Sequence, residues 1–204
     1  MTRPLSGRGP VALDEIVDAA LRLIRRDGLD QLTMRSVAKE LGVTPMATYH
    51  HVANKADLVA LVHDAVRREW DPLVLGDDGW EDALRRHLLA QWETYRRYPG
   101  LGAWQIGRPD LGTTPESYSV MVDFFRSAGF EEEAAVLAWS FAETYLLGRL
   151  TVDGRLHGLP RQHREGGPRA RNYVERGVDA LVAGIQATLS PTASGSTSRS
   201  RRAR

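Results

Sequence analysis

Apolar residues recur every three or four positions along most of the chain, which is the period of amphipathic helices. Ile16, Ala20 and Ile24 fall on one face of a helix predicted over residues 13–27. Three longer helices with the same period are predicted at about 80–98, 131–153 and 168–189. No useful length of chain alternates strictly between apolar and polar positions, so the sequence predicts an all-α protein.

Two short helices and the start of a third are predicted between residues 33 and 55. The hydroxyl of Thr33 is expected to cap the first, and Gly42 ends it in a tight turn. Thr44 and Pro45 open the next helix as a cap and a first helical position. Asn54 caps another helix that we expect to run to about residue 70.

The turn between these two short helices is typical of a helix-turn-helix unit. Ala38 falls where the helices would cross and only a small side chain fits, while Val37, Leu41 and Val43 would pin them together. In such a unit the second helix enters the major groove of DNA.

Polar groups at the helix starts suit this role, because hydroxyls, imidazoles, ammonium groups and free amides bind phosphate oxygens. A guanidinium such as that of Arg35 also recognises guanine through two hydrogen bonds. The polar candidates for DNA contact are Thr33, Arg35, Tyr49, His50, His51 and Lys55, with residues 49–51 expected on the second short helix. A plain surface role is the alternative for Tyr49 and the two histidines.

Residues 16–62, IVDAALRLIRRDGLDQLTMRSVAKELGVTPMATYHHVANKADLVALV, resemble the TetR family of bacterial repressors. The resemblance implies that Arg35 contacts a base or a nearby phosphate, and that the groove is faced by Thr44, Pro45, Met46 and Ala47. It also implies that phosphates are gripped by Tyr49, His51 and Lys55. Two positions depart from the family: Thr48 replaces a leucine that usually packs inward, and Ala47 replaces a common hydroxyl residue.

For the rest of the chain the resemblance implies a larger helical domain that binds a small-molecule effector and forms a homodimer. The dimer would use the helices at 131–153 and 168–189. Close approach of these helices would be permitted by their small residues, Ala135, Ala138, Ala142, Gly148, Gly177, Ala180 and Gly184. The alternative is that these small residues pack within one chain.

Aromatic and polar residues on the core-facing stretches of this domain could line the effector pocket. The candidates are Gln91, Trp92, Trp104, Tyr118, Met121, Phe125, Trp139 and Glu143. A plain core role is the alternative for each of the aromatic residues.

Net charge is +1, and residues 1–70 carry 10 basic and 9 acidic side chains, so a DNA-binding hypothesis rests on placement rather than on net charge. The tail at 190–204 is polar and carries four arginines, so we expect it to be disordered. The tail either touches the DNA backbone or is a solvated end. A glycine-rich loop is expected over 154–167.

The absence of cysteine excludes disulfides and thiolate sites. The N-terminus lacks a signal-peptide core, and no run approaches the ~18 apolar residues that span a membrane, so a cytoplasmic protein without membrane contact is expected. No metal site or cofactor is predicted, because the spacing of the histidines does not fit metal ligation. His63 and His87 are therefore expected to be solvated or singly hydrogen-bonded.

The sequence thus predicts a DNA-binding helix-turn-helix domain over 1–55, a linking helix to about 70, and an effector-binding and dimerisation domain over 71–189. The expected function is that of a transcriptional regulator, commonly a repressor, which a small-molecule effector releases from double-stranded operator DNA. The first alternative is a helical enzyme. The sequence has no nucleophile–base pair, phosphate loop or metal-ligand spacing, and nothing in it places Glu143 near His87 as a proton-transfer pair, so no enzyme is expected. The second alternative is a helical ligand-binding module without specific DNA readout.

Overall fold

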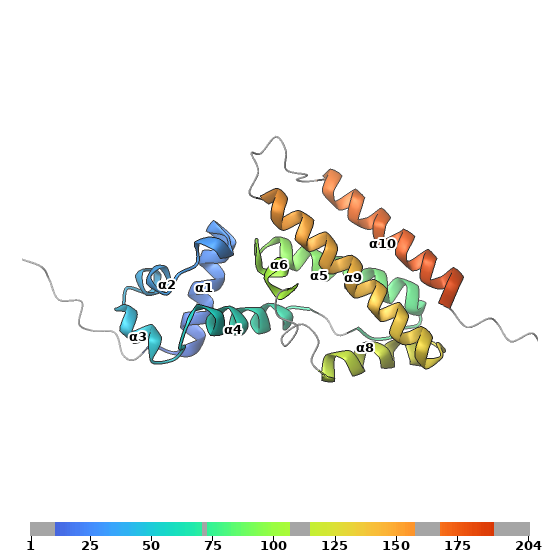
Figure 1. Cartoon of the computed structure of the whole chain (residues 1–204), viewed down its shortest axis with the longest axis horizontal. Helices are drawn as coiled ribbons and strands as arrows, with labels where there is room; N and C mark the ends of the chain where they lie inside the picture. The colour runs from blue at the N-terminus through green and yellow to red at the C-terminus, as the bar shows by residue number, and fades with distance from the viewer. Residues whose placement is uncertain (1–10, 71–72, 107–114, 158–167, 190–204) are drawn as a thin grey trace, which may run out of the picture.

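The computed structural model describes residues 11–70, 73–106, 115–157 and 168–189, and every regular element in these ranges is a helix. The elements are α1 Leu13–Asp27, η1 Leu29–Gln31, α2 Met34–Leu41, α3 Pro45–Tyr49, α4 Lys55–Arg67, α5 Gly79–Arg96, α6 Leu101–Ile106, α8 Pro115–Ser127, α9 Glu132–His157 and α10 Pro168–Leu189 (Figure 1). The predicted all-α class is confirmed.

Helices α1, α2 and α3 form a small unit at one end of an elongated molecule, which we call the head (Figure 1). The amphipathic pattern of α1 explains its packing, because Ile16, Ala20 and Ile24 are fully buried. Gly28 ends α1 with φ +85°, where a side chain would be strained, and its amide donates to the carbonyl of Ile24. Helix α4 lies against α1 and leads out of the head.

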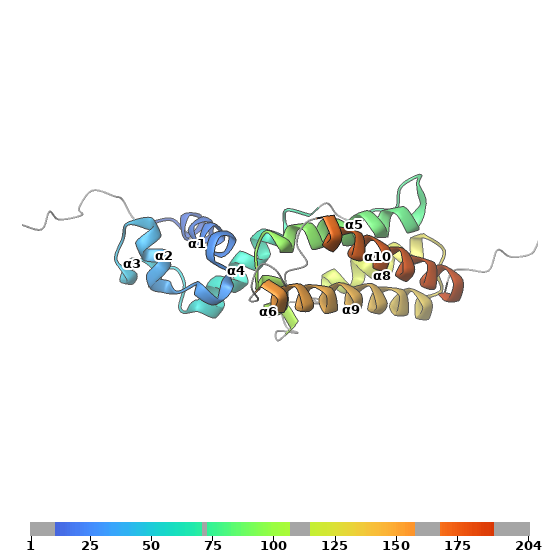
Figure 2. The ribbon, with the colours of Figure 1, turned by 90° about the horizontal axis from the view of Figure 1, so that it is seen from above.

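Helices α5 to α10 form the larger part of the molecule, which we call the body (Figure 2). Helix α9 contacts α5, α6, α8 and α10. Apolar residues occur all round α9, because one side packs against these helices while Leu137, Phe141 and Val152 stay exposed on the other. At the end of the body far from the head, the rings of Trp80, Phe125 and Phe130 pack with centroids 5.1–6.1 Å apart.

The structure corrects three expected element bounds. Helix α3 ends at Tyr49, so His50 and His51 follow the helix instead of lying on it. Helix α4 ends at Arg67, earlier than expected. Helix α9 continues to His157, so residues 154–157 are helical and not loop. The rest of that predicted loop and the tail at 190–204 lie outside the described residues, and the predicted domain limits stay predictions.

Within the described ranges, no helix has both the length and the apolar character needed to cross a membrane.

Candidate nucleic-acid interface

The turn between α2 and α3 has the geometry that its sequence predicts. Gly42 takes the left-handed conformation, with φ +70° and ψ +31°, which favours glycine. Val37, Ala38 and Leu41 are buried on the inner side of α2. Thr33 caps α2 by accepting a hydrogen bond from the amide of Ser36 at 3.0 Å. The two helices are therefore held in a fixed relation by local packing and by one glycine.

Thr48 is the inward-facing residue of α3. Its side chain is fully buried, and its Oγ1 donates a hydrogen bond to the carbonyl of Pro45 at 2.7 Å. The hydrogen bond offsets the cost of taking this hydroxyl out of water, so the methyl group of Thr48 can pack against the core. Threonine thus fills this position without exposing a polar group to the core.

The candidate DNA-contacting residues lie on α3, directly before and after it, and at the N-terminal ends of α2 and α4. Helix α3 lies at the end of the head far from the body, which we call the tip (Figure 1). All of the candidate residues are exposed except Ala47, which is half-buried. Met46 and Tyr49 project furthest among the apolar and aromatic side chains of α3, with 67% and 47% of their surfaces exposed. Thr44 precedes α3 as predicted, but its side chain makes no capping hydrogen bond.

Positive charge dominates this tip. Within the described residues, Arg35 and Lys39 of α2 form no ion pair. The one acidic residue between positions 33 and 55 is Glu40, which is engaged by Arg22 and Arg26 of α1 at 3.3 and 3.4 Å. The tip therefore attracts anions, although the chain as a whole is nearly neutral.

Lys55 has a partner that sequence reasoning missed. Its Nζ donates to the carbonyl of Leu29 at 3.2 Å, while the amide of Leu29 donates to the carbonyl of Pro99 at 2.9 Å. The peptide groups of Leu29 thus link the start of α4 to the turn between α5 and α6. Because Lys55 and Leu29 are 26 positions apart, no local sequence pattern indicates this contact.

Tyr98, at the same turn, joins the head to the body. Its buried hydroxyl accepts from Nη2 of Arg25 on α1 at 2.7 Å and donates to Oε1 of Glu69 at 2.7 Å. Arg97 adds an ion pair to Glu69 at 2.9 Å. Burial and the hydrogen bond to Glu69 raise the pKa of the Tyr98 hydroxyl. We call Arg25, Glu69 and Tyr98 the corner cluster.

A second group of polar side chains is buried where α4 meets the body. His63 is fully buried, and its Nε2 lies 3.1 Å from Oε1 of Gln105 and 2.9 Å from Oη of Tyr95. The expectation of a solvated or singly bonded His63 is therefore wrong, because α4 presents this position to the core. Since an amide oxygen only accepts, the ring proton lies on Nε2, and burial lowers the pKa of the ring.

Glu143 of α9 belongs to the same region, because its charge and that of Arg67 both act on Tyr95. Burial raises the pKa of the Glu143 carboxyl to about 7, against the opposing effect of Arg67. Two further buried atoms, Nδ1 of His63 on α4 and Nε1 of Trp70 just after that helix, have no hydrogen-bond partner among the described residues.

The structure brings only part of the predicted effector pocket to this region. Trp104 stands with its ring 6.0 Å from that of His63, and Glu143 is a neighbour of Tyr95. Trp92 instead donates from Nε1 to Asp153 at 2.7 Å, and Phe125 belongs to the far aromatic core. Gln91 contacts His87, Tyr118 is exposed, and Met121 and Trp139 are half-buried against the core.

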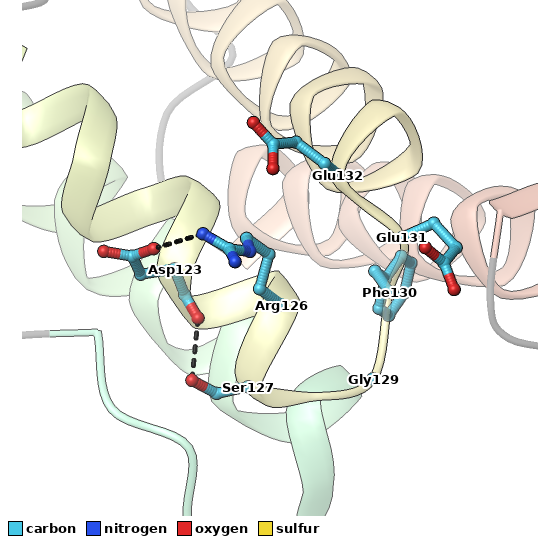
Figure 3. Close-up of a pocket in the computed structure, with 7 residues that line it drawn as sticks. All are labelled: Asp123, Arg126, Ser127, Gly129, Phe130, Glu131 and Glu132. Carbon is cyan, nitrogen blue, oxygen red and sulfur yellow. Dashed lines mark hydrogen bonds and ion pairs between the residues drawn. The ribbon is translucent and has the colours of Figure 1, made fainter.

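An open hollow of about 640 Å³ lies at the turn between α8 and α9 (Figure 3). Two of its charged side chains pair locally, with Arg126 3.4 Å from Asp123, and Ser127 donates to the backbone carbonyl of Asp123. None of the predicted pocket residues lines it. This hollow is therefore separate from the buried polar residues around His63.

The geometry defines a helical protein whose small head carries a helix-turn-helix unit. Residues 16–62 match the family described as bacterial regulatory proteins, tetR family. The HTH-type transcriptional repressor DrrR1 of Streptomyces coeruleorubidus is 34% identical over 149 residues, which cover 72% of this chain and 55% of DrrR1. Tetracycline repressor protein class D of Escherichia coli is 30% identical over 142 residues, or 66% of this chain and 63% of that protein. The matches span between half and two thirds of these relatives.

Solved structures share the fold. Apo ActR from Streptomyces coelicolor has a TM-score of 0.69 and 22% identity, covering 89% of this chain and 97% of ActR. A possible TetR family transcriptional regulator from Streptomyces coelicolor A3(2) has a TM-score of 0.72 and 22% identity, covering 86% and 99%. Residues 16–62 thus carry the DNA-binding segment of the TetR family of bacterial regulatory proteins, and the chain is similar to repressors of that family over most of its length.

Proposed function

We propose that the protein is a sequence-specific DNA-binding transcriptional repressor, which acts as a homodimer and leaves its operator when a small molecule binds the body. The observation that carries the proposal is the exposed, cationic tip of a rigid helix-turn-helix unit. Helix α3 would enter the major groove, while Thr33, Tyr49, His51 and Lys55 contact phosphates on either side. Its place of action would be the cytoplasm, because its partner is operator DNA.

A second copy of the chain fits the outer face of α9 and α10, which we call the bundle face. Leu137, Phe141 and Val152 form an exposed apolar stripe along α9, and Tyr173 is exposed on α10. A hollow of about 610 Å³ lies between them. An exposed apolar stripe on one helix, beside an exposed tyrosine of the neighbouring helix, favours a four-helix bundle with a partner.

The small residues of these helices support both alternatives that the sequence left open. Ala135, Ala138 and Ala142 are fully buried within the chain, and a Cβ at Gly177 would collide with the hydroxyl of Tyr145. A Cβ at Gly148 or Gly184 would meet open space. The first group packs inside one protomer, and the second leaves room for close approach of a partner helix.

The buried polar region around His63 is the best candidate for effector contact. The unpartnered Nδ1 of His63 and Nε1 of Trp70 are one acceptor and one donor that a ligand could satisfy. ActR has been solved in complex with (S)-DNPA and with actinorhodin. By analogy, this chain would bind a small molecule between α4 and the body.

The corner cluster gives a route by which the effector could act on DNA binding. Gln105 contacts His63 and lies on α6, which begins directly after the turn that contacts Leu29 and Arg25. A ligand that displaces Gln105 would move α6, the turn and then the head. The ligand favours this moved arrangement over the DNA-bound one only if it binds the moved arrangement more tightly.

We also infer that the protein is not an enzyme, as its named relatives are transcriptional regulators.

The test is DNA binding by the full-length protein and by Tyr49→Ala, measured at ~150 mM salt with the duplex upstream of its own gene and with the duplexes enriched from a random library. Tyr49→Ala should weaken specific binding, and the matched control Tyr118→Ala, which alters an exposed tyrosine of α8 outside the bundle face, should bind DNA as the wild type does. Equal binding by wild type and Tyr49→Ala would overturn the assignment of the head as the DNA contact.

A further inference from the structure

The exposed side of α3 has an unusual chemistry for a recognition helix. Its five residues, Pro45–Tyr49, include no amide, guanidinium, ammonium or carboxylate group. These are the groups that read bases through paired hydrogen bonds in the major groove. The hydroxyl of Thr48 is also unavailable, because it is fully buried and donates to Pro45.

Met46 is the most exposed large apolar side chain in the described part of the chain, at 67%. Its helix, α3, packs against α2, whose cations Arg35 and Lys39 form no ion pair within the described residues, so an anionic surface that meets these cations would also cover Met46. The DNA major groove offers such a surface, and its floor carries one apolar group, the C5 methyl of thymine.

We propose that Met46 contacts thymine methyl groups, so that α3 selects its operator bases by apolar contact. Recognition of guanine by hydrogen bonds would then come from Arg35, which lies on α2 and not on α3. The inference rests on the proposed function and adds the base that is recognised and the residue that recognises it.

The experiment removes single methyl groups from the DNA. Duplexes enriched from a random library by the wild-type protein are remade with deoxyuridine in place of each thymine, which leaves every base-pairing group intact. Affinity is then measured for the wild type, Met46→Ala, Met46→Leu and the control Val120→Ala, which shortens an exposed apolar side chain of α8.

At a contacted thymine, the wild type should lose about fourfold in affinity per methyl, corresponding to about 0.8 kcal/mol for one buried methyl group. Replacement in both half-sites should therefore cost about 16-fold. Met46→Ala should bind thymine and uracil duplexes equally, whereas Met46→Leu and Val120→Ala should keep the discrimination. Because Met46 is exposed, its variants should fold, which circular dichroism checks.

Three results would overturn the inference while the proposed function stands: enriched duplexes without a fixed thymine, no loss at any uracil, or a loss that persists in Met46→Ala. Failure of the wild type to enrich any sequence would overturn both the proposed function and the inference.

Discussion

The head and the body differ in how their candidate sites are built. The site in the head is made of exposed side chains within 23 consecutive residues, positions 33–55, whose geometry follows from one turn glycine and two helix caps. The buried polar region between α4 and the body takes His63, Tyr95, Gln105 and Glu143 from four helices. Local sequence therefore specifies the first site, while the second exists only after the helices have packed.

The largest expected effect tests the bundle face. Phe141→Asp places a charge on an exposed position, so each protomer should fold but not pair. DNA affinity should fall by on the order of 100-fold or more, because the second half-site is no longer tethered. Light scattering measures the mass of the protein in solution. The matched control is Val120→Asp on α8, which should remain dimeric. A Phe141→Asp protein that remains dimeric would contradict this account of the interface.

The next prediction concerns Glu143 in the body. Its carboxyl has a pKa raised from 4.5 to about 7 by burial, so the folded state holds a proton that the unfolded state releases. Stability from this group is present below pH 4.5 and is lost as pH rises through about 7. Glu143→Gln should remove about 3 kcal/mol of that pH dependence.

Urea unfolding of wild type and Glu143→Gln across this pH range measures the difference. His63, whose pKa is lowered, contributes the opposite slope below its ordinary value of 6.5, and it is present in both proteins. Parallel pH profiles for the two proteins would show that Glu143 does not hold a proton in the folded state.

A smaller effect is expected at the corner cluster. Tyr98→Phe removes the hydrogen bonds to Arg25 and Glu69, and should cost about 1 to 2 kcal/mol of stability. If the cluster fixes the head on the body, hydrogen exchange at the Leu29 amide should accelerate. Tyr118→Phe, on the surface of α8, should change neither. Unchanged hydrogen exchange at the Leu29 amide in Tyr98→Phe would show that the corner cluster does not fix the head on the body.

The smallest effect is expected at Thr48. Thr48→Val keeps the shape and loses the hydrogen bond to Pro45, which should cost about 1 kcal/mol of stability. Operator affinity should stay within about threefold of the wild type, because the side chain does not reach the groove. A loss of more than about tenfold in affinity without loss of folding would make Thr48 a reader of DNA.

These differences explain what the sequence could predict. The bounds of α1 and the cap of α2 depend on neighbouring residues, and both were predicted correctly. The partner of Lys55 and the burial of His63 depend on helices far along the chain, and both were missed. The position of His63 between the apolar Val59, Val62 and Val66 of α4 was the available signal of burial.

The predicted effector pocket shows the same limit. Trp92 and Phe125 fit the pattern of core-facing aromatic residues, but one bonds to Asp153 and the other joins the far aromatic core. Periodicity predicts which residues face inward and not which of them meet. Tertiary packing alone brings Trp104 and Glu143 to the region around His63.

The most direct test of the central claim is the affinity of the wild-type protein for its best enriched duplex and for a random duplex, at ~150 mM salt. Specific recognition by the head predicts a preference of ~1,000-fold or more. Equal, weak and strongly salt-dependent binding to both duplexes would contradict it, and would leave a cationic helix-turn-helix unit that holds DNA without reading its sequence.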